Sequence, residues 1–315
     1  PQVDLLVVCS HLGLPRDKEM AEQIPGIDCI LGGHTHHLLT EPLIIGETMV
    51  CAAGKFGEYV GEAEFRLSLP DKRIAARSAR CHPVEKFAAD AGLADLIRMS
   101  REAARAKLSE KVADLPVPLD NAWHEESPLG NLLAHGLKAW TGAEAAVVNA
   151  GQILNSLAQG AITREMILEI CPSPINPCRM KLRGAAIRQA LEEALLEEYI
   201  MKPIKGFGFR GKVLGTLCLD GLEVVYDPAR PDRNKIVEIT LGGEPLDDRR
   251  LVDLATIDMF TFGIGYLSLQ HGEEITYYLP EFIRDLLIRE LRNPSSVEDC
   301  FVPRWKKVRH IPPNG

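Results

Sequence analysis

The first third of the chain alternates between continuous apolar runs and short polar segments. Residues 3–9 (VDLLVVC) and 27–31 (IDCIL) are apolar and rich in β-branched residues, and residues 16–24 between them favour a short helix. Continuous apolar strands separated by short helices are typical of a sheet that is covered on both faces, so both strands are expected to be buried. Three further strands are expected at 49–53, 59–69 and 73–84.

A long helix is expected after this first unit. Residues 85–111 are rich in Ala, Leu, Arg and Glu and contain no proline, which favours helix. Beyond them helices and strands follow in mixed order, which indicates a separate α/β or α+β domain. The elements expected there are helices at 130–140 and 184–199 and strands at 144–149, 213–226, 235–241 and 251–257. The pattern therefore predicts three parts, with boundaries 1–84, 85–111 and 112–315.

Composition narrows the class of protein. Of the 315 residues 46% are hydrophobic and 25% are charged, which is ordinary for a globular protein with two domains. No apolar stretch reaches the ~18 residues of a membrane span. The net charge of −8 argues against nucleic acid as a partner, because phosphate backbones attract basic surfaces. A small phosphorylated substrate remains compatible with that charge, since bound cations make a site locally positive.

The eight cysteines are dispersed and form no CxxC pair, so they predict neither a zinc ribbon nor a disulfide scaffold. Several lie in apolar runs, where a reduced thiol behaves as a small hydrophobic group, and we expect a reducing, cytoplasmic compartment. Pro1 is no initiator and stands directly before a strong strand pattern, so we expect the chain to be a fragment. A sheet truncated in this way exposes unpaired backbone and apolar surface, and aggregation or marginal stability is expected.

Three histidines follow the ends of the two apolar runs. His11 follows VVCS, and His34 and His36 stand in GGHTH. Open α/β sheets place their sites at the carboxyl ends of strands, so the three imidazoles are expected to converge there. Neutral imidazoles on rigid strand ends suit zinc, manganese or iron. The His-x-His spacing is expected to put both rings on one side of an extended segment, and Gly32 and Gly33 leave room for an ion or a phosphate.

A lone histidine after a strand is usually a loop residue, and His11 by itself supports no more than that. The combination of SHLG at one strand end with GGHTH at the next predicts a metal site. These motifs, with AAGKFGEYVG after them, resemble the last three blocks of the calcineurin-like metallophosphoesterases, in the branch of bacterial 5′-nucleotidases and UDP-sugar hydrolases. The rest of the chain is similar to the substrate-recognition domain of these enzymes. That similarity rests on ESPLGNLLAHGL (126–137), VVNAGQIL (147–154), the PINP segment (174–177) and FGIGY (262–266).

The resemblance covers nearly the whole chain and implies a fold of α/β and α+β type. Residues 1–84 would be the carboxy-terminal part of a two-sheet metallophosphoesterase sandwich, 85–111 a helical linker and 112–315 the 5′-nucleotidase-type substrate-recognition domain. The family holds two divalent ions, and zinc, manganese, iron, cobalt, magnesium and calcium are equally compatible with the motifs. Two such ions polarise the phosphoryl oxygens and lower the pKa of a bound water toward ~7.

Carried over onto this sequence, the family pattern assigns His11 and His34 to one metal and His36 to the other. His37 lies outside the pattern and is expected to be a second-layer or surface group. The chain contains no Asp-x-His and no Asn-His pair, so the family's first three blocks are absent, including the bridging aspartate and the catalytic histidine. The catalytic residue of this chain is therefore unknown. A fragment with three imidazoles is expected to hold at most one of two ions that lie ~3.5–4 Å apart.

In the second domain, Asn131, Asn149 and Gly151 match the family and are the expected substrate-binding residues, with support of the fold as the alternative role. Elsewhere the chain departs from the pattern. Ile264 replaces the ribose-binding Asp and Leu154 replaces an arginine. Trp123 stands near another arginine position, and Thr216 and Asp258 align with the two stacking phenylalanines. Phe207, Phe209, Phe260 and Phe262 are expected to be mainly core, with stacking on the substrate as the alternative. The basic residues Arg179, Lys181, Arg183 and Arg188 are expected on a solvated face, with an anion patch as the alternative.

The sequence therefore predicts a metal-dependent phosphoester hydrolase for a nucleotide or a related phosphorylated metabolite. Because the ribose-binding Asp is lost, a nucleotide sugar, a cyclic nucleotide or a non-nucleotide phosphomonoester is an alternative substrate. A catalytically incomplete ligand-binding module is an alternative of a different class, since the metal site lacks part of its ligands.

Overall fold

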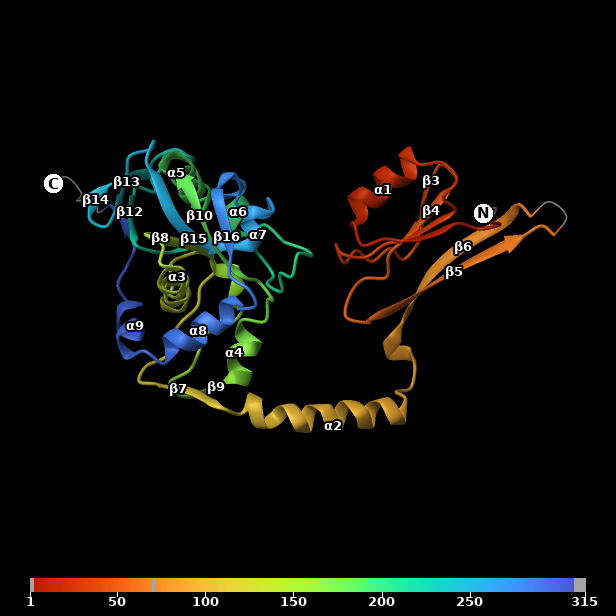
Figure 1. The fold of residues 1–315 in the computed structure, drawn as a ribbon, viewed down its shortest axis with the longest axis horizontal. Helices are drawn as coiled ribbons and strands as arrows, with labels where there is room; N and C mark the ends of the chain where they lie inside the picture. Colours follow the sequence, from red (N-terminus) through yellow and green to blue (C-terminus); the bar gives the residue numbers. More distant parts are fainter. Residues whose placement is uncertain (1–2, 70–71, 309–315) are drawn as a thin grey trace, which may run out of the picture. The chain divides into compact units, whose positions relative to one another are not determined.

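The computed structural model describes residues 3–69 and 72–308, which divide into two compact units (Figure 1). Unit 1 holds residues 1–100 with 205–207, and unit 2 holds 101–204 with 208–315. The helix expected between the parts is present as α2 (Ala91–Leu108) and has no buried residue. The boundaries 1–84, 85–111 and 112–315 remain a prediction. Mixed α and β structure in several sheets confirms the expected fold class.

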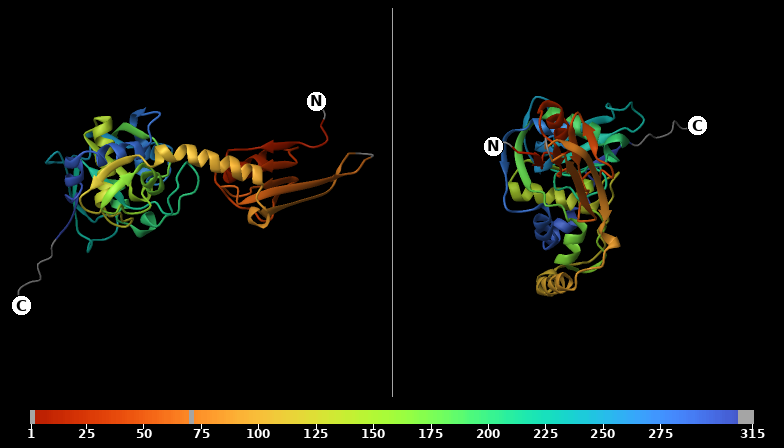
Figure 2. Two further views of the ribbon diagram at one scale, coloured as in Figure 1. Left: turned by 90° about the horizontal axis from the view of Figure 1, so that it is seen from below. Right: turned by 90° about the vertical axis from the view of Figure 1, so that its right-hand side faces the viewer.

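Unit 1 is built on a four-stranded sheet in the order β1-β2-β4-β3. Strands β1, β2 and β4 run parallel, and β3 pairs antiparallel with β4. The bounds are β1 (Val7–Cys9), α1 (Leu14–Gln23), β2 (Cys29–Leu31), β3 (Leu43–Ile45) and β4 (Thr48–Cys51). Strands β5 (Tyr59–Leu67) and β6 (Ile74–Pro83) pair as a long two-stranded ribbon (Figure 2).

The core of unit 1 is small. Helix α1 packs on the sheet and contributes Leu14 and Ala21, which meet Ile30 and Val50 from the two central strands. The apolar run 3–9 forms a shorter and more exposed strand than its pattern predicts, because β1 is the edge of the sheet and Val7 is 41% exposed. The prediction of a buried strand there is wrong, whereas the buried strand at 27–31 is confirmed for Cys29 and Ile30.

Unit 2 has a five-stranded sheet in the order β11-β8-β15-β10-β16 and a four-stranded sheet in the order β14-β13-β12-β17. The strands are β7 (Lys111–Leu115), β8 (Ala145–Asn149), β9 (Gly160–Thr163), β10 (Pro177–Arg183), β11 (Leu217–Asp220), β12 (Leu222–Tyr226), β13 (Ile236–Leu241), β14 (Glu244–Pro245), β15 (Leu251–Ile257), β16 (Glu273–Tyr277) and β17 (Trp305–Lys307). The α-helices are α3 (Pro128–Thr141), α4 (Arg164–Ile170), α5 (Gly184–Glu193), α6 (Glu197–Ile200), α7 (Asp258–Thr261), α8 (Ile283–Leu291) and α9 (Pro294–Asp299).

Helix α3 is the centre of this unit and packs against β8, β11 and α8. Its start is encoded by Ser127, whose side chain accepts a hydrogen bond from the Gly130 amide (3.3 Å), and by Pro128 in the first turn. Its end is encoded by Gly142, which has the left-handed backbone (φ 68°) of a helix terminus. The helix expected at 184–199 is two helices, α5 and α6, separated by residues 194–196.

Candidate metal centre at the strand ends

The parallel pairing of β1 and β2 brings two of the three expected histidine ligands together. Cys9 pairs with Leu31, and the Ser10 amide donates to the Leu31 carbonyl (2.9 Å), so the segments after both strands begin side by side. The rings of His11 and His34 lie with their centroids 5.0 Å apart and their planes at 64°. His11 is exposed. Two imidazoles this close at one sheet edge fit a shared cation, because imidazole nitrogen is a ligand of borderline divalent metals.

The backbone of the GGHTH segment forms turns and is not extended. His34 and His36 both have positive φ (60° and 55°), and the Thr35 amide donates to the Gly33 carbonyl (2.7 Å). The expectation of an extended segment with two rings on one side is therefore wrong, because left-handed residues reverse the chain direction locally. The ring nitrogens of His11, His34 and His36, which all belong to the described residues, do not all lie within 4.8 Å of one another.

Thr35 fixes this turn through its hydroxyl group. The Leu14 amide donates to Thr35 Oγ1 (3.1 Å), which ties the turn to the start of α1. Nδ1 of His37 lies 2.9 Å from the same oxygen, so His37 contacts a turn residue. Gly33 leaves room for His11, since a Cβ at Gly33 would lie 3.1 Å from His11 Nδ1. The sequence prediction missed Thr35, because a threonine in a loop gives no signal by itself.

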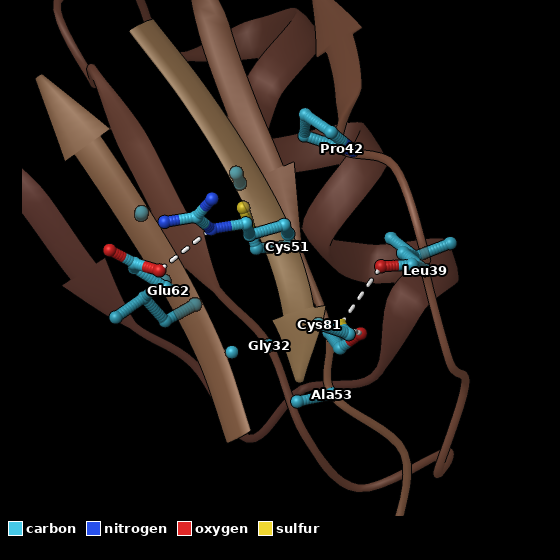
Figure 3. Close-up of a pocket in the computed structure, with 13 residues that line it drawn as sticks. Gly32, Leu39, Pro42, Cys51, Ala53, Glu62 and Cys81 are labelled. Atoms are coloured by element: carbon cyan, nitrogen blue, oxygen red, sulfur yellow. Dashed lines mark hydrogen bonds and ion pairs between the residues drawn. The ribbon is translucent and has the colours of Figure 1, made fainter. Parts of the chain in front are cut away.

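A cavity of about 180 Å³ lies in unit 1 between the sheet and the β5–β6 ribbon (Figure 3). Its lining is mainly apolar and includes the thiols of Cys51 and Cys81. The Cys81 thiol donates to the Leu39 carbonyl (3.2 Å), and burial raises the pKa of this thiol. An exposed ion pair between Glu62 and Arg80 (2.8 Å) closes one side. The Cys81 thiol and this ion pair are therefore engaged with protein groups.

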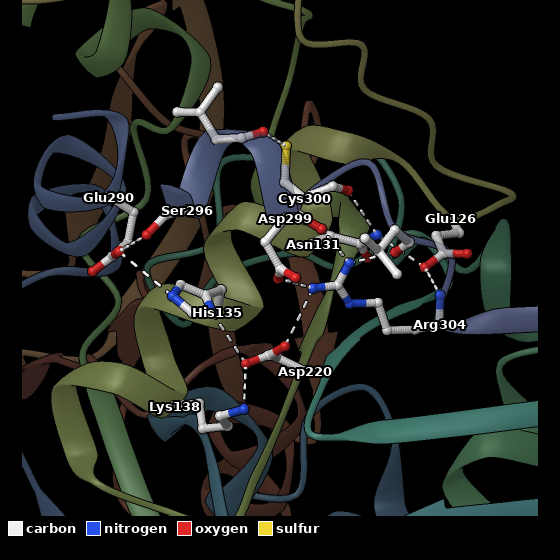
Figure 4. Close-up of polar contacts among 12 residues, drawn as sticks. Glu126, Asn131, His135, Lys138, Asp220, Glu290, Ser296, Asp299, Cys300 and Arg304 are labelled. Carbon is white, nitrogen blue, oxygen red and sulfur yellow. Dashed lines mark hydrogen bonds and ion pairs between the residues drawn. The ribbon is translucent and has the colours of Figure 1, made fainter. Parts of the chain in front are cut away.

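In unit 2, His135, Asp220 and Asp299 have ligand atoms within 4.8 Å of one another, the one such trio in the part of the chain that the structure describes (Figure 4). Two cations already occupy this cluster. Lys138 Nζ lies 2.8 Å from Asp220 Oδ2, and Arg304 pairs with both Asp220 and Asp299. A metal ion would have to displace these cations, so the cluster is a network of ion pairs that holds α3, β11 and the carboxy-terminal segment together.

The three expected substrate-binding residues are in or beside the core of unit 2. Asn149 is fully buried, donates to the Leu214 carbonyl (2.6 Å) and accepts from Gln152 (3.0 Å). Asn131 is 2% exposed and donates to Glu126 Oε1 (2.9 Å) and the Cys300 carbonyl (3.2 Å). A Cβ on Gly151 would lie 2.0 Å from the Val213 carbonyl oxygen. These contacts are with protein groups, and substrate binding by the three residues stays a prediction.

The aromatic residues expected in the core separate into two groups. Phe260 and Phe209 are buried (0% and 4% exposed), as expected. Phe262 is 61% exposed and stacks on Tyr277 with centroids 6.1 Å apart, so the expectation of a core role is wrong for this residue. Phe207 is 37% exposed, which also corrects the expectation.

The residues at the family's stacking positions serve the fold. Asp258 accepts from the Asn176 amide (3.3 Å), and burial raises the pKa of its carboxyl group. The Thr216 hydroxyl donates to the Ala194 carbonyl (2.9 Å). Both contacts are with backbone groups of the protein.

The basic residues around β10 lie on its solvated face, as expected. Arg179 pairs with Asp253, and Lys181 pairs with Glu274, which raises the pKa of both basic groups through these hydrogen bonds. Arg188 pairs with Asp248 (2.9 Å). The anion patch that this cluster suggested is therefore a set of surface ion pairs.

Two Bacillus subtilis proteins are among those to which the chain is similar. The chain is 36% identical over 92% of its length to the Bacillus subtilis protein named Uncharacterized metallophosphoesterase YunD, and it spans 63% of that relative. It is 28% identical over 97% of its length to the B. subtilis Trifunctional nucleotide phosphoesterase protein YfkN, of which it spans 22%. The metallophosphoesterase family implies divalent metal ions.

None of the helices in the described ranges has the length and apolar character needed to cross a membrane.

Solved structures show the same fold. A Staphylococcus aureus protein solved in complex with alpha-ketoglutarate matches with a TM-score of 0.70 at 18% identity, over 97% of this chain and 64% of that one. A 5′-nucleotidase precursor from Thermus thermophilus matches with a TM-score of 0.54 at 22% identity, over 98% of this chain and 65% of that one. The family model of the 5′-nucleotidase C-terminal domain matches residues 106–267, just over half of the chain. The chain therefore belongs to the 5′-nucleotidase family.

Proposed function

We propose that the native protein that contains this chain is a metal-dependent phosphoester hydrolase. The observation that carries the proposal is the pair of imidazoles, His11 and His34, 5.0 Å apart at the ends of adjacent parallel strands. The donors fit divalent metals, and His11 is exposed to solvent. The named relatives are a metallophosphoesterase and a nucleotide phosphoesterase, which supports the same reaction class.

In this proposal His11 and His34 hold one divalent ion, and His36 contributes to a second ion. When bound, the ions supply Lewis-acid polarisation of the phosphoryl group. The chain's own contribution is orientation. The Thr35 hydroxyl fixes the turn that carries His34 and His36, and Gly33 lets the backbone approach the His11 ring.

The substrate is proposed to be a nucleotide or a related phosphorylated metabolite. The names of relatives support a nucleotide, since they include apyrase and 5′-nucleotidase proteins. The residues at the family's stacking positions support a wider range, because Thr216 and Asp258 stand where the resemblance expects two phenylalanines. A panel of a nucleoside monophosphate, a nucleotide sugar, a cyclic nucleotide and a sugar phosphate separates these substrates by their rates of phosphate release.

The decisive experiment measures phosphate release by the native protein with Mn²⁺ and after chelation. We expect activity only with metal, and a loss of at least ~100-fold in His34→Ala, because removing a metal ligand removes the ion that stabilises the transition state. His82→Ala is the matched control, since His82 pairs with the exposed Glu62 in the same unit (2.7 Å). Equal turnover of His34→Ala and the control would end the proposal. A wild-type protein that binds no metal would support the ligand-binding module instead.

We further propose a reducing, cytoplasmic location. All eight cysteines are free, and five of them are buried in apolar surroundings. Burial raises the pKa of the Cys171 and Cys218 thiols to about 12, which keeps these groups protonated and unreactive. Fractionation of cells that produce the native protein tests this location.

A further inference from the structure

A buried carboxylate lies next to the histidine pair. Asp17 stands in the first turn of α1 and is 1% exposed. Among the described residues, no lysine, arginine or histidine forms an ion pair with it. Leaving a carboxylate buried without a cation costs several kcal/mol unless another positive charge or hydrogen bonds compensate it.

The hydrogen bonds of Asp17 lead directly to His11. Asp17 Oδ1 accepts a hydrogen bond from the Ser10 hydroxyl. The same hydroxyl oxygen accepts from the Leu12 amide (3.1 Å). Ser10 and Leu12 are the two neighbours of His11 in the chain, so this single hydroxyl fixes the backbone on both sides of the histidine.

Two consecutive glycines bring the carboxylate and the imidazole to the same short stretch of backbone. A Cβ on Gly32 would lie 2.4 Å from Asp17 Oδ2, and a Cβ on Gly33 would lie 3.1 Å from His11 Nδ1. Asp17 and His11 therefore each pack against one of these glycines. Any residue larger than glycine at position 32 would push the carboxylate away.

We propose that Asp17 is a positioning residue of the metal centre, which orients His11 through Ser10 and places a negative charge beside the bound cation. Groups behind metal ligands orient the ligands and tune their affinity for the ion, typically by 10–100-fold. A cation in the site would in turn offset the buried charge of Asp17. This inference rests on the proposed function, because it needs a metal at His11 and His34.

The test compares Asp17→Asn with wild type in the native protein and uses Mn²⁺ alone as the probe. Asparagine keeps the shape and an acceptor for Ser10 but removes the charge. We expect Mn²⁺ affinity, followed by electron paramagnetic resonance, to fall by about 10–100-fold. The melting temperature of the metal-free protein is expected to stay equal or rise, because an uncompensated buried charge is removed. A role in folding alone would instead lower that melting temperature and leave Mn²⁺ affinity unchanged, and this result would overturn the proposal.

Two further variants make the result specific. Asp28→Asn is the matched control, because Asp28 accepts from the Leu6 amide (2.7 Å) at the other end of β2, and its Mn²⁺ affinity should equal that of wild type. Ser10→Ala cuts the link to His11 but keeps the charge, so a smaller loss of affinity is expected. If Asp17→Asn fails to fold, Ser10→Ala decides: weaker Mn²⁺ binding supports the proposal and unchanged binding rejects it. A wild-type protein without Mn²⁺ binding would contradict the proposed function itself, whereas equal binding by wild type and both variants would contradict only the role of Asp17.

Discussion

The two units use their ionisable side chains in opposite ways. In unit 1 the histidines stand at strand ends on a small core, and His11 and His34 contact each other without forming an ion pair to any carboxylate among the described residues. In unit 2 the ionisable groups near His135 are paired. Asp220, 5% exposed, is contacted by His135, Lys138 and Arg304. Both regions bring together residues that bind metals in other proteins, but in unit 2 protein cations already pair with the carboxylate donors.

This difference shows that short distances between residues of metal-binding types do not by themselves identify a metal site. The trio in unit 2 is tighter than the histidine cluster in unit 1. Its carboxylates are nevertheless neutralised by protein cations, and a buried carboxylate with such partners contributes to folding. Charge compensation therefore distinguishes the two regions better than distance does.

Among the variants that test the difference between the two units, Arg304→Ala should have the largest effect on stability. Arg304 is 6% exposed and pairs with Asp220 and Asp299, so its loss leaves a buried carboxylate with fewer partners. We expect the free energy of unfolding of unit 2 to fall by about 3 kcal/mol, measured by chemical denaturation, with Mn²⁺ affinity unchanged. Arg188→Ala removes a partly exposed pair and should cost less than about 1 kcal/mol. Equal costs for the two variants would contradict the structural role of the unit 2 cluster.

A smaller effect is expected in the pH dependence of the stability of unit 2. The hydrogen bond to Asp220 raises the pKa of His135, and the nearby carboxylates of Glu290 and Asp299 act in the same direction. A raised folded pKa stabilises the fold below the unfolded value of about 6.5, and this contribution is lost as pH rises through the folded pKa. The melting temperature of unit 2 should therefore fall as the pH rises from about 6.5 through the raised pKa of His135.

His135→Gln should remove most of the fall in melting temperature with rising pH, because glutamine cannot take up the proton.

Asp220 does not contribute to the loss of stability as the pH rises above about 6.5. Burial acts to raise its pKa, but the hydrogen bonds from His135 and Lys138 hold it well below its ordinary value. Its contribution is present above about pH 4 and is lost only as pH falls further. If the melting temperatures of wild type and His135→Gln depended on pH in the same way, protonation of His135 would not contribute to the stability of the fold.

Much of the fold follows from local pattern. The apolar strands, α1, α2 and α3 are present close to where apolar runs and residue composition predict them. The exposure of β1 could not be read from its apolar run, because exposure depends on which strands lie beside it. The same limit explains Phe262, whose spacing resembles that of the buried Phe260.

The site was only partly predictable for a related reason. His11 and His34 are found from strand-end motifs, since parallel pairing brings such ends together. Asp17 was missed because an acidic residue in the first turn of a helix is ordinary, and its burial depends on the approach of Gly32 from a distant segment. The positive φ of His34 and His36 was missed because non-glycine residues seldom adopt it.

The most direct test of the account is the Mn²⁺ content of the native protein and two variants after dialysis against the metal. We expect the double variant His11→Ala/His34→Ala to lose at least one bound ion per chain, and Asp299→Asn in unit 2 to keep the wild-type content. Loss of metal from Asp299→Asn, with full retention in the double variant, would place the metal in unit 2 and contradict the account.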